Sequence, residues 1–196
     1  MDRSPETLTD NELASLVRGA AGGDGTAWDA LVRRFGALVW SIARAHRLSD
    51  ADAADVSQTT WLRLVEHLDR LRQPERVGSW IAATTRNECL RILRLSGRQL
   101  LVGEEFELVD ENTPPPGAAM LTAERDEALW RAFQALTPRC QALLQVIVAT
   151  PPPTYEELAA ALDVPIGSIG PTRARCLDRL RRHPELARLF VGRDDL

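Results

Sequence analysis

The chain has 196 residues, of which 44% are hydrophobic and 27% are charged, proportions that are ordinary for one large or two small globular domains. Its longest strongly apolar run, residues 143–149, is far shorter than the roughly 20 residues that cross a bilayer, and the N-terminus has no apolar signal core, so we expect a cytoplasmic protein without membrane insertion. The formal net charge of −4 is unevenly distributed: residues 1–98 carry 14 Arg and 13 acids, residues 99–127 carry one Arg and eight acids, and residues 128–196 carry nine Arg and seven acids.

Three helices are expected at the start of the chain. Thr9 and Glu12 have the spacing of a capping box, and from Trp28 to His46 apolar side chains recur at steps of three and four residues, which predicts one long core helix. Ser49 can cap a third helix. The inner face of that third helix would hold Ala53, Val56, Trp61, Leu64, Val65 and Leu68, and its outer face would carry Asp52, Asp55, Gln58 and Glu66.

A fourth helix is predicted from Val77 to Ser96, after a break at Pro74. One of its faces is moderately apolar, and another carries a row of arginine and amide side chains. This row consists of Asn87, Arg91, Arg94 and Arg98, with Arg86 beside it. Guanidinium and amide groups suit contacts with phosphates and base edges, whereas a solvated helix surface is the plainer explanation of the same row.

The helical period fails from Gln99 to about Ala123, where the acidic sequence EEFELVDENTPPPG appears. Clustered charge and three consecutive prolines favour an extended chain, so we expect a linker between two domains. Its carboxylates are concentrated within eight residues, at Glu104, Glu105, Glu107, Asp110 and Glu111.

The second helical part opens with apolar positions at Leu129, Ala132, Phe133 and Leu136, and the pair Thr137-Pro138 begins its next helix. That helix is expected to stop before the run Thr150-Pro151-Pro152-Pro153, because proline cannot continue it.

A helix-turn-helix is predicted from Thr154 to Arg182. Thr154 and Glu157 form a second capping box, Asp163-Val164-Pro165 interrupts the helix, and Ser168 can cap the next one. The second helix is rich in arginine, which suits DNA reading, although an ordinary helical hairpin with a solvated face would have the same pattern.

No catalytic, metal-binding or cofactor-binding motif is evident. Cys89, Cys140 and Cys176 are widely spaced, without a CxxC pair or a histidine in ligand register, so we expect buried thiols. A helical hydrolase that uses Cys89 or a histidine would need a nucleophile, a base and an orienting group, and the sequence shows no such arrangement.

Four segments together resemble the extracytoplasmic-function (ECF) branch of the sigma-70 superfamily, the sigma factors of bacterial RNA polymerase. In order, these segments are GDGTAWDALVRRFGALVWSIA, DADAADVSQTTWLRLVEHLD, SWIAATTRNECLRILR, and ALTPRCQALLQVIV followed by TYEELAAALDVPIGSI. The resemblance implies an all-α protein with a sigma-2 domain at 1–98, the acidic linker at 99–123 and a sigma-4 domain at 124–196. The implied partners are the beta-prime clamp helices and the beta flap of core polymerase, promoter DNA and an anti-sigma factor.

The resemblance also assigns site residues. Contact with core polymerase falls on Asp52, Asp55 and Gln58. Contact with the minus-ten element falls on Arg72, Arg76, Arg86, Asn87, Arg91 and Arg94. Contact with the minus-thirty-five element falls on Ser168, Thr172, Arg173, Arg175 and Arg179. Trp80 matches a tryptophan of the family and is interpreted mainly as core at the base of the 68–76 loop, and the linker would thread the RNA exit channel.

Two positions depart from the family pattern. Arg91 stands where an acid is common, and Gly170-Pro171 follows Ser168-Ile169 in the reading helix, which shifts base readout toward Thr172, Arg173 and Arg175. The expected function is therefore that of an ECF sigma factor and not of an enzyme. The alternative is a polymerase-independent helix-turn-helix transcriptional regulator, which would need to dimerise to read paired half-sites.

Overall fold

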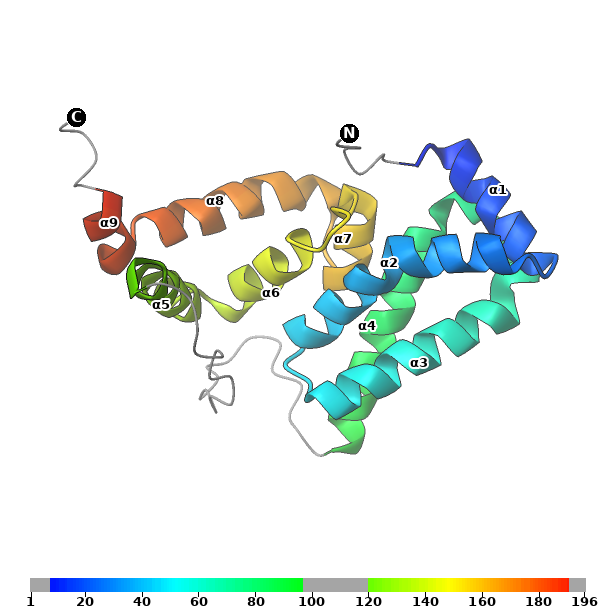
Figure 1. The fold of residues 1–196 in the computed structure, drawn as a ribbon, viewed down its shortest axis with the longest axis horizontal. Helices are drawn as coiled ribbons and strands as arrows, with labels where there is room; N and C mark the ends of the chain where they lie inside the picture. Colours follow the sequence, from blue (N-terminus) through cyan, green and yellow to red (C-terminus); the bar gives the residue numbers. More distant parts are fainter. Residues whose placement is uncertain (1–7, 97–119, 191–196) are drawn as a thin grey trace. The chain divides into compact units, whose positions relative to one another are not determined.

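A computed structural model describes residues 8–96 and 120–190, and within those ranges every regular element is helical (Figure 1). The prediction of an all-α fold is confirmed for this part of the chain. The five linker carboxylates and Arg98 lie outside the described residues.

The described residues form two compact units. The first unit is built by the helices and 3-10 turns of residues 8–96 and 142–169: α1 (Asp10–Ala21), α2 (Gly25–Ala45), α3 (Asp50–His67), η1 (Leu68–Arg70), η2 (Pro74–Arg76), α4 (Val77–Leu95), α7 (Tyr155–Leu162) and η3 (Ile166–Ser168). The second unit holds α5 (Met120–Gln134) and α9 (Pro184–Phe190). Two helices are shared between the units: α6 (Pro138–Ile147) leaves the second unit after Gln141, and α8 (Ile169–Arg181) enters it at Gly170.

The helix starts in the first unit are fixed by local side chains. Thr9 and Glu12 form the expected capping box of α1, and the Ser49 hydroxyl accepts a hydrogen bond from the Asp52 amide at the start of α3. Asp24, which lies between two glycines, caps α2. The second predicted capping box, of Thr154 and Glu157, is also present and begins α7. These caps satisfy amides that lack partners inside the helix.

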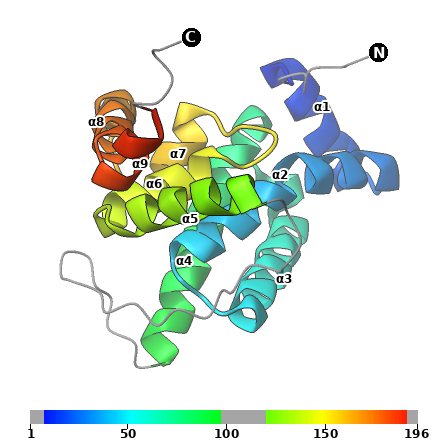
Figure 2. The same ribbon diagram turned by 60° about the vertical axis from the view of Figure 1, so that its left-hand side comes forward.

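The core of the first unit forms around α2, which packs against α1, α3 and α4 (Figures 1 and 2). Its fully buried side chains include Leu31, Phe35, Leu38 and Ile42, as the apolar period predicted. The inner face of α3 differs from the prediction at one position, because Val65 is 56% exposed.

Thr60, a polar residue that the apolar period did not select, is fully buried on α3. Its hydroxyl donates to Thr85 Oγ1 on α4 at 3.4 Å, and the Thr85 hydroxyl donates to the Ile81 carbonyl at 2.8 Å. The buried hydroxyls therefore satisfy each other and the backbone, which is the condition for placing polar groups in a core.

Helix α7 packs on α4 within the first unit, and Gly78 makes the close approach possible. A Cβ atom at Gly78 would lie 2.2 Å from Glu157 Oε1 and 2.8 Å from Phe35 Cε1. Glu157 is only 4% exposed there. The start of α7 thus occupies the space that a larger side chain on α4 would fill.

The described residues of the second unit pack around a group of buried side chains. These are Ala132, Leu136, Cys140, Gln141, Cys176 and Leu186. The Gln141 amide donates to the carbonyls of Phe133, Gln134 and Leu136, which ties α6 to the end of α5. Leu129, predicted to be an apolar position of this part, is 46% exposed.

The prediction of three buried thiols is wrong for two of the cysteines. Cys140 on α6 and Cys176 on α8 form a disulfide, with a Cα–Cα distance of 5.4 Å. Only Cys89 is a free buried cysteine among the described residues, and burial raises the pKa of its thiol to about 12. Sequence spacing could not reveal the pair, because its members are 36 residues apart and on different helices.

Candidate functional site

The outer face of α3 carries two polar side chains without an evident structural task. Asp55 and Gln58 are exposed, and neither side chain has a hydrogen bond or ion pair to another described residue. Asp52, one turn earlier, is half-buried and accepts a hydrogen bond from the Ser49 hydroxyl at 2.8 Å. Asp52 therefore belongs partly to the helix cap, whereas Asp55 and Gln58 are available to a partner.

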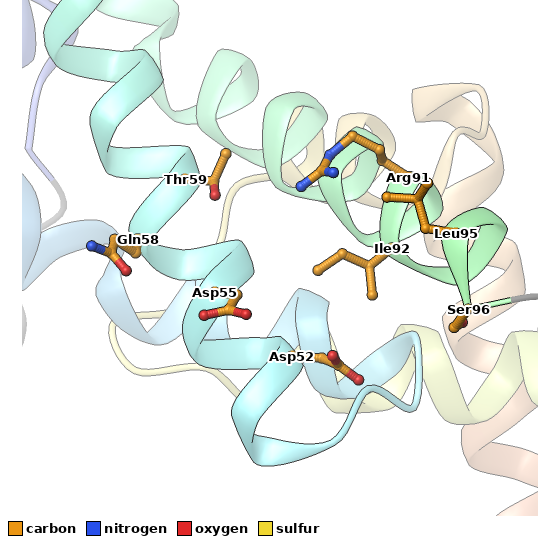
Figure 3. Close-up of a pocket in the computed structure, with 8 residues that line it drawn as sticks. All are labelled: Asp52, Asp55, Gln58, Thr59, Arg91, Ile92, Leu95 and Ser96. Atoms are coloured by element: carbon orange, nitrogen blue, oxygen red, sulfur yellow. The ribbon is translucent and has the colours of Figure 1, made fainter.

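These three residues line an open groove between α3 and α4 (Figure 3). On the α4 side, the groove is lined by Arg91, Ile92, Leu95 and Ser96. Leu95 is 74% exposed, so the groove combines carboxylates with accessible apolar surface. Figure 3 shows Thr59 and Arg91 pointing into the space between the helices, whereas Gln58 points away from α4. The structure thus brings Arg91, predicted to contact DNA, beside the residues predicted to bind polymerase.

Arg91 is anchored by a residue that the sequence did not single out. Glu88 is buried with 2% exposure. Its Oε1 forms an ion pair with Arg63 on α3 at 2.6 Å, and its Oε2 accepts a hydrogen bond from Arg91 on α4 at 2.7 Å. Each oxygen binds one guanidinium, so the buried charge is compensated. The spacing of three residues between Glu88 and Arg91 was the only local signal for this arrangement.

Arg86 is also engaged. Its Nη1 lies 2.5 Å from Asp163 Oδ2 at the C-terminal end of α7, and its Nη2 donates to Asn87 Oδ1 at 3.2 Å. The guanidinium side chain is 18% exposed, and the buried Nε has no hydrogen-bond partner among the described residues. Asp163 has a left-handed backbone, with φ of 54°, at the predicted helix break.

The remaining residues predicted to contact the minus-ten element are accessible. Asn87 and Arg94 are exposed on α4, and Arg72 and Arg76 are exposed in the segment between α3 and α4. Trp80 at the base of that segment is half-buried, and its ring centroid lies 5.7 Å from that of His67.

Another ion pair joins α7 to α2. Arg34 Nη2 is 3.5 Å from Glu157 Oε2, with the two side chains 10% and 5% exposed. Burial raises the pKa of the Glu157 carboxyl above its usual value, and the Arg34 charge opposes that shift. His46, at the end of α2, has its pKa lowered to about 4 by burial and by the nearby Arg86 charge.

On the predicted reading helix, Arg173, Arg175 and Arg179 are exposed and Thr172 is half-buried. Arg175 folds back on the first turn of α8, where its Nε donates to the Pro171 carbonyl and its Nη2 donates to Thr172 Oγ1, both at 3.3 Å. Arg173 makes no such contact with another described residue, so the two arginines differ in their freedom to reach a ligand.

Ser168 directly precedes α8, where the sequence placed its cap. Its hydroxyl donates to the Pro165 carbonyl at 2.7 Å, within the 3-10 turn η3. The hydroxyl therefore stabilises the turn that leads into the helix.

None of the described helices is both long and apolar enough to cross a membrane. Across residues 8–96 and 120–190, no three His, Cys, Asp or Glu side chains are grouped so as to hold a metal ion.

Residues 31–99 match the family model described as sigma-70 region 2. Two curated relatives extend the likeness. The ECF RNA polymerase sigma factor SigE of Mycolicibacterium smegmatis is 28% identical over 144 residues, covering 72% of this chain and 55% of the relative. The ECF RNA polymerase sigma-E factor of Escherichia coli K12 is 25% identical over 173 residues, covering 84% of this chain and 88% of the relative.

A solved structure, that of CnrH in complex with the cytosolic domain of CnrY, has a similar fold, with a TM-score of 0.55 and 18% identity over 92% of this chain and 98% of that one. Residues 31–99 are therefore similar to sigma-70 region 2, and the solved structure shows the likeness of the helical fold. Both curated relatives are named as ECF RNA polymerase sigma factors, so the chain is similar to that branch over most of its length. The match spans about half the length of the mycobacterial relative and most of the length of the enterobacterial one.

Proposed function

We propose that this chain acts in the cytoplasm as a promoter-specificity subunit of bacterial RNA polymerase. In this proposal residues 1–98 form the domain that binds core polymerase and the minus-ten element, residues 124–196 form the domain that reads the minus-thirty-five element, and the acidic segment between them connects the two. The observation that carries the proposal is the exposure of Asp55 and Gln58, which line a groove inside the region that matches sigma-70 region 2.

Core polymerase would bind at the groove between α3 and α4. The groove offers carboxylates from α3 and an exposed apolar side chain, Leu95, from α4. A partner helix with basic and apolar side chains fits this chemistry, because apolar contacts supply affinity and charge complementarity fixes the register. The clamp helices of the beta-prime subunit are the expected partner.

Promoter opening would use α4 and the segment before it. Arg72, Arg76 and Arg94 can bind phosphates, and the Asn87 amide can read a base edge. Separating strands costs a few kcal/mol for each unstacked base, and contacts with the captured base offset that cost. Arg86 would join this surface only after its ion pair with Asp163 opens. Arg86 can therefore bind either Asp163 or DNA, but not both.

Upstream recognition would rest on α8. Arg173 is free to reach the major groove, where arginine pairs bidentately with guanine and discriminates bases by roughly 1–3 kcal/mol. Arg175, Arg179 and Thr172 would then hold phosphates or adjust the register of the helix.

An anti-sigma protein is the further partner that we propose. CnrH, which shares the fold, is in complex with the cytosolic domain of CnrY. A regulatory protein that covers the groove between α3 and α4 would keep polymerase away. Competition between such a protein and core polymerase for the purified chain would test this assignment.

The test of the main proposal combines binding and transcription. The double variant Asp55→Ala, Gln58→Ala should bind core polymerase at least about tenfold more weakly, a loss of roughly 1.4 kcal/mol, because both side chains would be buried at the interface. Its thermal midpoint should be unchanged, since neither side chain has a partner within the described part of the chain.

Asp29→Ala is the matched control, because Asp29 is an exposed acid on α2 outside the groove. Run-off transcription from genomic fragments should require both this chain and core polymerase. Full affinity of the double variant for core would refute the assignment of the groove, and transcription control without core would favour an independent regulator.

A further inference from the structure

We propose that Cys140 and Cys176 are a reversible dithiol–disulfide pair, whose oxidation by a small-molecule disulfide holds the reading helix α8 against α6 and whose reduction loosens it. The structural part of this inference concerns only the second unit. Its consequence for DNA rests on the function proposed above.

The two cysteines join α6 and α8 covalently. Cys140 is 5% exposed and Cys176 is 1% exposed, so the cross-link runs through the interior of the unit. Among the described residues of the unit, the other buried apolar side chains are Ala132, Leu136 and Leu186. Where so few apolar side chains pack together, a covalent cross-link contributes correspondingly more to holding the helices in place. Loss of the bond should therefore affect the packing of α8 more than it would in a large core.

The position of Cys176 connects the bond to the predicted reading surface. Cys176 directly follows Arg175 and lies three residues after Arg173 on the same helix. Because helical residues have fixed angular positions, a bond that holds Cys176 inward also fixes the directions in which both arginines leave the helix. Rotation or fraying of α8 in the reduced unit would move both arginines together.

The chemistry is a pair of thiol–disulfide exchanges. The thiolate of one cysteine attacks a sulfur of glutathione disulfide, which forms a mixed disulfide and releases one glutathione thiolate. The second cysteine then attacks its partner's sulfur and releases the second glutathione. Two protein thiols lose two electrons and two protons, and one glutathione disulfide becomes two glutathione thiols. Both cysteines are buried, so exchange requires local opening of the unit.

Cys89 serves as an internal control. It lies on α4 in the first unit, is fully buried and has no disulfide partner. Its thiol pKa of about 12 leaves almost no thiolate near neutral pH, so Cys89 should not react under the same conditions.

The test uses the full chain equilibrated in glutathione buffers from fully reducing to fully oxidising. Alkylation under denaturing conditions, followed by mass spectrometry, should count three free thiols at the reducing end and one at the oxidising end, with Cys89 as the remaining thiol. Hydrogen exchange of the α8 amides should be at least about tenfold faster in the reduced form, because exchange reports local opening. The variant Cys140→Ala, Cys176→Ala should exchange rapidly in every buffer, whereas Cys89→Ala should respond as the wild type does.

A DNA readout separates this inference from the proposed function. The probe is a duplex selected from a random-sequence pool by the oxidised wild-type protein, and its dissociation constant should rise about tenfold on reduction, which corresponds to roughly 1.4 kcal/mol. Three free thiols in oxidising buffer, or equal exchange of α8 in both forms, would overturn the proposal. Faster exchange on reduction with no selectable duplex would uphold the redox pair and count against DNA reading by α8.

Discussion

Replacing Gly78 by alanine should destabilise the first unit, although alanine is the better helix former. In a helix interior, exchanging glycine for alanine raises the free energy of unfolding by up to about 1 kcal/mol. Gly78 is only the second residue of α4, so the increase from helix propensity is smaller there. The new Cβ would lie 2.2 Å from Glu157 Oε1 and 2.8 Å from Phe35 Cε1. Both neighbours resist displacement, because Glu157 is held by Arg34 and Phe35 is fully buried.

The magnitude follows from these opposing effects. Overpacking a core costs about 1–3 kcal/mol, and any displacement of Glu157 also weakens a buried ion pair whose complete loss costs about 3–5 kcal/mol. The net loss should be about 1–3 kcal/mol. At about 2–4 °C for each kcal/mol, the thermal midpoint should fall by several degrees.

The assay is thermal unfolding followed by circular dichroism, with Gly36→Ala as the matched control. Gly36 lies inside α2, and a Cβ there would meet nothing within 4 Å. Gly36→Ala should therefore raise the midpoint, by the equivalent of about 0.5–1 kcal/mol. If Gly78→Ala were as stable as Gly36→Ala, the close packing of α7 on α4 would be refuted.

Three further predictions concern charge and the DNA-facing surface. The pKa of His46 is lowered from 6.5 to about 4 on folding, so the unfolded chain takes up a proton that the folded chain does not, and up to about 3 kcal/mol of folding free energy should be lost between pH 7 and 4. The free energy of unfolding of His46→Gln, measured with urea, should depend less on pH, and a pH profile identical to that of the wild type would contradict this. Asp163→Asn keeps a residue that tolerates the left-handed backbone but removes the ion pair with Arg86, so holoenzyme with this variant should bind single-stranded promoter DNA up to about fivefold more tightly. An unchanged affinity would argue that Asp163 and DNA do not compete for Arg86. Asn87→Ala should impair open-complex formation at some promoter sequences more than at others, whereas Arg94→Ala should weaken binding to all sequences and lower the slope of log affinity against log salt concentration by about one. Normal promoter opening with both variants would contradict a role of this face of α4 in DNA contact.

The features that the sequence predicted well are those with a local period or a fixed spacing. The capping boxes of Thr9 and Thr154, and the apolar stripe of α2, depend on residues three or four positions apart, so their pattern is visible without the fold. The exposure of Asp55 and Gln58 followed from the same period.

The features that the sequence did not predict join residues far apart in the chain. Thr60 is buried because Thr85 accepts its hydrogen bond, and Cys140 is bonded to Cys176 on another helix. The engagement of Arg86 by Asp163 likewise arises only when α7 packs on α4. The members of such pairs lie on different helices or at their ends, so the helical period does not relate their positions. Only the packing of the helices brings them together.

Glu157 makes the start of α7 dependent on the rest of the first unit. Its Oε2 accepts from the Thr154 amide at 2.9 Å and lies 3.5 Å from the Arg34 guanidinium, so one oxygen both caps the helix and joins it to α2. An isolated helix of eight residues is not stable in water, even with a good cap. We therefore expect α7 to become ordered after α2 and α4 have assembled, and to unfold first when either Arg34 or Glu157 is replaced. The pair would then set the folding order, because we expect the first helix of the predicted helix-turn-helix to become ordered only on an assembled N-terminal core.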